Sequence, residues 1–177
     1  MCFAIQASNP TTLEARDDST TLSDAIESVF PLNTEDAILK WNYIFVPLGY
    51  KYDMCLLIDD VLNIITEMHT HPQGSLTVTW PSSTFLATWR MTWAAGTLDV
   101  HAEWFDVVGS TETLLTSRPD LKIGIDDFIA EWKRPLQIIE SALTAAGYDE
   151  SLPGLGLLRA TIANIVGEGE LYRSQPI

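Results

Sequence analysis

The chain has 177 residues, which is enough for one domain whose hydrophobic core needs neither a metal nor a disulfide for stability. Its 24 acidic and 10 basic residues give a net charge of −14, which disfavours binding to nucleic acid or to anionic lipid. The N-terminus shows no basic leader, and no stretch approaches the roughly 18 apolar residues of a membrane span. We therefore expect a soluble, cytoplasmic protein without a cofactor, with Cys2 and Cys55 as free thiols.

The N-terminal part of the chain is predicted to contain little regular structure. Residues 1–7 fit either an edge strand or a buried terminal segment. Residues 8–23 are rich in serine, threonine and aspartate and nearly free of large apolar side chains, so we predict a mobile polar loop. Ser23 or Asp24 is then expected to cap a short helix that Pro31 ends.

The segment from Ala37 to Met68 is predicted to hold a strand and a helix. Aromatic and β-branched residues in Ala37–Gly49 favour a strand, although Ala37–Trp41 could instead continue a helix. Asp53 is predicted to be the N-cap of a helix that runs to about Met68. One apolar stripe follows the helical period along Met54, Leu57, Ile58, Val61, Ile65 and Met68. The opposite face carries Asp59 and Asp60, so this helix should lie on a sheet with its acids outward.

Three consecutive antiparallel strands are the strongest pattern in the sequence. We predict them at Leu76–Trp80, Thr84–Ala94 and Thr97–Val108, because apolar and polar residues alternate over each of them. A two-residue hairpin loop at Ala95-Gly96 would fix the register of the last two strands. It would place large residues opposite small ones on one face: Trp93 with Leu98, Met91 with Val100, Trp89 with Ala102, and Ala87 with Trp104.

The other face of these strands is polar and charged. The same register puts Arg90 beside His101, with Asp99 and Glu103 on the diagonals, so one cation lies among acids. This face suits contact with solvent, whereas the tryptophan face requires a cover.

The C-terminal third is predicted to be helical. A polar connection over Gly109–Asp120 should lead into the longest helix, which begins at Asp126 or Asp127. Pro135 should kink or split that helix, because it removes a backbone donor and clashes with the preceding turn. We expect the helix to end at Gly147 with a hydrophobic contact from Tyr148, and a last helix to span about Leu155–Val166 before Gly167.

Taken together, these elements predict an α+β fold in a single globular domain, residues 1–177. The sheet would be small and antiparallel, formed by the three-stranded meander at about 75–108 plus one or two further strands. The helices would pack on one of its faces.

Three histidines are the main candidates for chemistry. His69 and His71 follow Glu67 at a helix end, and His101 lies on the sheet, so imidazole and carboxylate could bind a metal such as zinc. A small metal-dependent enzyme or ligand-binding protein that uses His69, His71 and His101 is therefore the alternative function. The chain has no cysteine pair and no His-Glu-x-x-His motif, so a polar loop after a helix is the favoured interpretation.

Other catalytic signatures do not occur in the sequence. It contains neither a Gly-x-Ser-x-Gly nucleophile motif nor a phosphate-binding loop that ends in Gly-Lys-Ser/Thr. The adjacent acids Asp59-Asp60 and Asp126-Asp127 fit a solvated helix face and a helix N-terminus respectively. A stable core, a strong negative charge and no catalytic set are typical of a binding protein rather than an enzyme.

The region from about Asp53 to Tyr148 contains the stretches Leu-Ile-Asp-Asp-Val-Leu, Ser-Ser-Thr-Phe-Leu, Ala-Glu-Trp, Phe-Ile-Ala-Glu-Trp-Lys-Arg-Pro-Leu and Ala-Gly-Tyr. In these stretches, and in its small, acidic, single-domain character, the chain resembles the immunity proteins of bacterial polymorphic toxin and contact-dependent growth inhibition systems. The resemblance implies a protein that binds a cognate toxin domain, often a basic nuclease, and blocks it. An acidic scaffold or chaperone for another basic partner is a further possibility.

Four acids on regular elements are the candidate partner-binding residues. Asp59 and Asp60 lie on the predicted helix, and Asp99 and Glu103 lie on the predicted sheet. Acidic groups accelerate association with a basic partner and complement a site built for phosphate.

Overall fold

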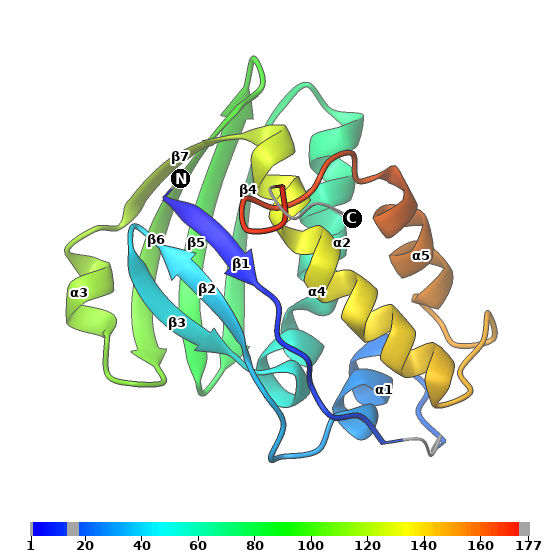
Figure 1. Ribbon diagram of the computed structural model, residues 1–177. Coiled ribbons are helices and arrows are strands. Elements are labelled where there is room, and N and C mark those ends of the chain that lie inside the picture. Colours follow the sequence, from blue (N-terminus) through cyan, green and yellow to red (C-terminus); the bar gives the residue numbers. More distant parts are fainter. Residues whose placement is uncertain (1, 14–17, 174–177) are drawn as a thin grey trace.

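The strands of the computed structural model, which describes residues 2–13 and 18–173, form two antiparallel sheets (Figure 1). The first has the order β1-β2-β3, with bounds Phe3–Gln6, Ala37–Trp41 and Ile44–Leu48. The second has the order β4-β5-β6-β7, with bounds Gln73–Ser82, Phe85–Ala94, Thr97–Val107 and Asp120–Gly124. The α+β class is confirmed, but the further strands build a separate sheet instead of only extending the meander.

Helices follow and connect these strands. They are α1 (Leu22–Val29), the π-helical turn η1 (Tyr50–Met54), α2 (Cys55–Thr70), α3 (Glu112–Thr116), α4 (Ile125–Ala145) and α5 (Leu155–Asn164). Within residues 2–13 and 18–173, none of the helices combines the length and hydropathy that a membrane crossing requires.

The predicted register of β5 and β6 is confirmed. Trp93 lies opposite Leu98, Met91 opposite Val100, Trp89 opposite Ala102, Ala87 opposite Trp104, and Arg90 opposite His101. A bulge between Leu86 and Ala87 shifts the pairing at the far end, where Phe85 meets Val107. The two-residue loop at Ala95-Gly96 sets this register, and the strict alternation of the two strands agrees with it.

The tryptophan face of the four-stranded sheet is covered partly by the three-stranded sheet. The ring centroids of Trp41 on β2 and Trp89 on β5 are 5.0 Å apart, and Phe3 on β1 meets Trp89 at 6.4 Å. Trp80 and Trp104 contact Trp89 edge-on from the neighbouring strands. The two sheets thus join through an aromatic layer, a cover that the sequence patterns did not reveal.

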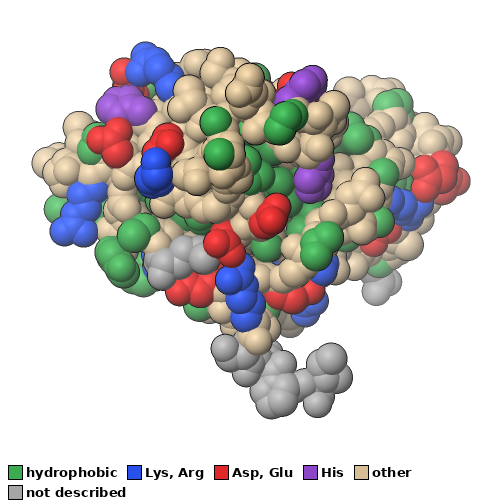
Figure 2. Space-filling view, turned by 90° about the horizontal axis from the view of Figure 1, so that it is seen from above, with side chains coloured by type: hydrophobic (Ala, Val, Ile, Leu, Met, Phe, Trp, Pro, Cys, Tyr) green, Lys and Arg blue, Asp and Glu red, His purple; other side chains and the backbone are tan. Residues whose placement is uncertain are grey.

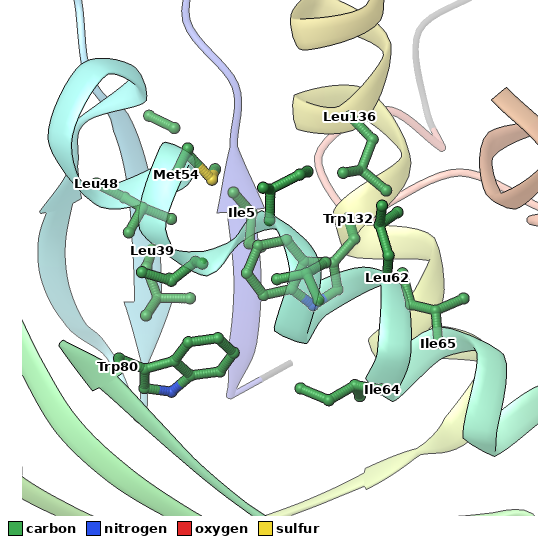
Figure 3. Packing of buried hydrophobic residues seen from close by; sticks show 14 of the residues in the cluster. Ile5, Leu39, Leu48, Met54, Leu62, Ile64, Ile65, Trp80, Trp132 and Leu136 are labelled. Atoms are coloured by element: carbon green, nitrogen blue, oxygen red, sulfur yellow. The ribbon is translucent and has the colours of Figure 1, made fainter. Parts of the chain in front are cut away.

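Helices α2 and α4 complete the core beside this aromatic layer. Figure 3 shows side chains from β1, β2, α2 and α4 converging on a shared interior, among them Ile5, Leu39, Leu62 and Trp132. The predicted apolar stripe of α2 is buried throughout. Buried residues from Phe3 to Ile165 belong to one hydrophobic cluster.

The N-terminal half differs from prediction at two turns. Thr21, not Ser23 or Asp24, caps α1, because its Oγ1 accepts the Asp24 N–H at 3.1 Å. Ala37–Gly49 is a β-hairpin rather than one strand, and Asn42 and Tyr43 form its turn with φ of 48° and 68°. Asn-Gly is the usual sequence for such a turn, and this chain has tyrosine at the second position, so the sequence did not predict the turn.

Asp53 was wrongly predicted as the N-cap of the following helix. It lies inside η1, where its Oδ2 accepts the Gly49 N–H at 2.6 Å. Its Oδ1 accepts hydrogen bonds from the hydroxyl groups of Ser82 and Thr84. The buried carboxylate therefore ties the start of the helix to the β4–β5 connection.

The C-terminal half differs in three respects. The connection 109–120 contains α3, and β7 follows it as a strand that the sequence patterns missed. Helix α4 begins at Ile125 and continues through Pro135 without being split. Gly147 and Tyr148 end α4 as predicted, with the Tyr148 N–H donating to the Leu143 carbonyl oxygen, whereas α5 ends at Asn164, before Gly167.

Part of the predicted polar loop at 8–23, residues 14–17, lies outside the described residues. Residues 8–13 and 18–21 contain no helix or strand, whereas Leu22 and Ser23, the last two residues of the predicted loop, begin α1. Hydrogen bonds hold residues 8–13 against the end of α1 and the segment after it. The Leu13 N–H donates to the Val29 carbonyl oxygen at 2.8 Å, and the Asn9 N–H donates to Glu35 Oε2 at 3.0 Å. Cys2 and Cys55 are free thiols, as predicted.

The C-terminal segment, residues 167–173, folds back against β1 and α4 (Figure 1). Glu131 on α4 is buried, and its two carboxylate oxygens accept the N–H groups of Ile5 at 2.9 Å and Glu170 at 2.6 Å. The Ala7 N–H donates to the Tyr172 hydroxyl at 2.8 Å, and Lys40 pairs with Glu170 at 3.1 Å. The free edge of β1 is thus bonded to side chains instead of to a further strand.

Candidate functional site

The two candidate acids on the sheet are each paired with a cation of the same chain. Arg90 Nη1 lies 2.7 Å from Glu103 Oε1, and Lys122 Nζ lies 3.1 Å from Asp99 Oδ1. Arg90 comes from β5 and Lys122 from β7, so the unpredicted strand supplies the second cation. His101 Nδ1 lies 2.7 Å from Asp120 Oδ1 on the same face.

These pairs are exposed to solvent, and they neutralise much of the charge on the face. The hydrogen bonds from Arg90 lower the pKa of Glu103, and the same contact raises the pKa of Arg90. Exposed ion pairs contribute little to stability. They do reduce the negative potential available to a partner, so Asp99 and Glu103 are weaker candidates for partner binding than the sequence suggested.

The two candidate acids on α2 have a different environment. Asp59 is exposed and Asp60 is half-buried, and neither has an ion-pair partner in the described part of the chain. Partial burial and the adjacent charge of Asp59 both raise the pKa of Asp60. Two like charges therefore lie next to each other on one helix, and no described cation forms an ion pair with either of them.

The neighbouring helix α1 extends this acidic region. It packs against α2, and its exposed side carries Asp24 and Glu27, which are likewise without an ion pair among the described residues. Lys51 reaches α1, but its Nζ donates to the Glu27 backbone carbonyl oxygen at 2.6 Å rather than to a carboxylate. We call the exposed acids Asp24, Glu27 and Asp59, together with the half-buried Asp60, the α1–α2 acidic face.

The three histidines do not form one group. His71 Nδ1 lies 3.1 Å from Glu67 Oε2 at the end of α2, whereas His101 pairs with Asp120 on the sheet. In Figure 2 the histidine side chains lie at separate places on the surface. Residues 2–13 and 18–173 contain no group of three or more His, Cys, Asp or Glu side chains that could hold a metal ion. The geometry thus gives no support to a metal site at His69, His71 and His101.

A further site, which the sequence patterns missed, is a small hollow beside Asp53. Its wall consists of four segments: the chain after α1, the stretch from the end of β3 through η1, the β4–β5 connection, and the residue that follows β6. Its volume is about 160 Å³. Asp36 and Asp53 both lie in its wall, and a Cβ atom added to Gly49 would lie within 3.3 Å of both carboxylates. We call it the Asp36 pocket. Its two acids are far apart in the sequence and only the β2–β3 hairpin brings them together, so no local motif indicates it.

Comparison with known proteins identifies no relative of this chain. A scan against protein-family models gives no match, and searches of curated proteins and of solved structures give no match either. The functional argument therefore depends on the geometry of this chain.

Proposed function

We propose that this protein is an immunity protein that binds and neutralises a basic toxin domain without catalysis of its own. The observation that carries the proposal is the contrast between the two sets of acids. Asp99 and Glu103 are paired within the chain, whereas Asp59 and Asp60 remain unpaired among the described residues although Asp60 is partly desolvated. The resemblance of the segment from Asp53 to Tyr148 to toxin-system immunity proteins agrees with this interpretation.

The electrostatic cost at Asp59 and Asp60 has a simple physical meaning. Two adjacent carboxylates repel each other, and partial burial further disfavours the charged form of Asp60. A cation from a partner would relieve both effects, so an ion pair with it would make binding more favourable. The net charge of −14 would also accelerate the encounter with a basic domain.

The test uses a candidate toxin domain encoded beside the gene. We expect Asp59→Asn/Asp60→Asn to weaken binding by about 2–5 kcal/mol if the acids contact a cation of the partner. Asp99→Asn/Glu103→Gln is the matched control, because it removes the same formal charge from acids that are already paired. The control should lower the association rate and the affinity only slightly.

Salt separates steering from contact. A rise from about 50 to about 500 mM salt shortens the Debye length to a few Å, so long-range attraction should disappear while a desolvated contact persists. Equal affinity of the wild-type protein and both double variants, unchanged by salt, would refute acid-mediated neutralisation.

A further inference from the structure

The Asp36 pocket is bordered by exposed apolar side chains. Leu32 is 70% exposed, Tyr52 46% and Val108 41%, and all three line the pocket. They come from three separate parts of the chain: the segment after α1, η1, and the residue that follows β6. Exposed apolar side chains gathered around a cavity are typical of a surface that another molecule covers.

The interior of the pocket is negative. Partial burial and the nearby charge of Asp53 raise the pKa of Asp36. Asp53 itself is buried, and its hydrogen bonds come from uncharged donors, namely Gly49, Ser82 and Thr84. Lys51 also lines the pocket, but its ammonium group donates to the Glu27 carbonyl oxygen and makes no ion pair with either aspartate. Two carboxylates and one ammonium therefore line the pocket, which gives it a formal charge of −1, and neither carboxylate makes an ion pair among the described residues.

The size of the pocket restricts its occupant. At about 160 Å³ it is smaller than the roughly 300–1,000 Å³ of pockets that enclose drug-sized ligands. An apolar rim around a carboxylate matches a side chain with an aliphatic stem and a cationic end, that is, lysine or arginine.

One exposed stripe leads from the pocket toward Asp59 of the α1–α2 acidic face. It consists of Tyr52, Leu56, Asp59 and Asn63, separated by four, three and four positions. This spacing places them on one side of the helix, with Tyr52 in the pocket wall and one acid, Asp59, further along. An interface with an apolar centre beside charged residues has the usual arrangement of protein–protein contacts.

From this geometry we infer that the Asp36 pocket receives a lysine or arginine side chain of the bound partner. The inference depends on the proposed function for the identity of the partner, the toxin domain. Leu32, Tyr52 and Val108 cover the aliphatic stem, and the cationic group pairs with Asp36. Asp53 holds the wall of the pocket in place through its bonds to Gly49 and Thr84.

The first test needs no partner. Butylammonium and ethylguanidinium chloride, which mimic the two side chains, are titrated into the protein while backbone amide signals are followed by NMR. We expect saturable shifts at Asp36, Leu32, Tyr52 and Val108, and at least a fivefold loss of affinity in Asp36→Asn. Asp106→Asn removes one charge from an exposed acid on β6 outside the pocket and should titrate like the wild type. No saturable shift at these residues would overturn the inference.

The second test uses the toxin domain. Asp36→Asn should weaken the complex at least tenfold and Asp106→Asn less than twofold. An unchanged dissociation constant for Asp36→Asn, in a complex that the wild type does form, overturns the pocket while the proposed function stands. No complex with the wild type refutes the proposed function and removes the partner on which the inference depends. Thermal unfolding of Asp36→Asn at the wild-type midpoint shows that the variant is folded.

Discussion

Glu131 on α4 accepts the backbone N–H of Ile5 on β1 at 2.9 Å, across 126 positions of the sequence. The bond leaves β1 on the side away from β2, so a side chain occupies a position that a further strand would otherwise fill. The second oxygen of Glu131 bonds Glu170, and the same carboxylate therefore connects the N-terminal strand with the C-terminal segment.

Replacement of Glu131 by glutamine should destabilise the protein. The amide has one acceptor oxygen, so its NH₂ group would face either the Ile5 or the Glu170 N–H and leave that donor unpaired in the interior. We expect the free energy of unfolding to fall by about 1–3 kcal/mol. Urea unfolding measures this change, and a midpoint equal to that of the wild type would show that the two bonds contribute nothing.

The same carboxyl group should make stability depend on pH. Burial raises the pKa of Glu131 above its ordinary value of 4.5, although the bonds from Glu170 and Ile5 oppose the shift. A raised pKa means that the folded state binds the proton more tightly, so this contribution to stability is complete below about 4.5 and is lost as the pH rises through the raised pKa. The free-energy difference between wild type and Glu131→Gln should therefore grow on acidification. A constant difference from about pH 7 to 4.5 would contradict the shift.

Trp89 is the centre of the aromatic layer, 1% exposed and in ring contact with Trp41, Trp80 and Trp104. Trp89→Ala should cost about 3–5 kcal/mol, because it leaves a large cavity between the two sheets. Trp132→Ala on α4 should cost a similar amount. Denaturant midpoints within error of the wild type would show that these side chains are not packed as described.

Tyr43 is in the left-handed region, with φ of 68°, and its side chain is 64% exposed. Glycine adopts this conformation without strain, so Tyr43→Gly should raise the free energy of unfolding by up to about 1 kcal/mol. Tyr43→Ala is the control, since it removes the ring but keeps Cβ and hence the strain. Equal stability of the two variants would mean that the backbone conformation has no cost here.

The sequence predicted the parts of the fold that are set by local alternation. The register from Ala87 to Trp104 follows from the two-residue loop at Ala95-Gly96 together with two faces of opposite character, and the buried stripe of α2 follows from its helical spacing. Strand β7 was missed because five residues, Asp-Leu-Lys-Ile-Gly, carry too short a pattern beside a polar connection. The sequence could not rank the four candidate acids, because Asp99 and Glu103 become weaker candidates only once their ion pairs with Lys122 and Arg90 are known. The Asp36 pocket depends on four separate segments, so no window of the sequence contains it.

The link between Glu131 and β1 also bears on how the chain folds during synthesis. The ribosome makes Ile5 early and Glu131 more than a hundred residues later, as the separation of 126 positions shows. Until α4 has left the exit tunnel, the outer N–H of β1 has no intramolecular acceptor, and Glu170 joins later still. The N-terminal strand should therefore stay open to proteases and chaperones on the nascent chain until α4 and the segment that contains Glu170 have been made.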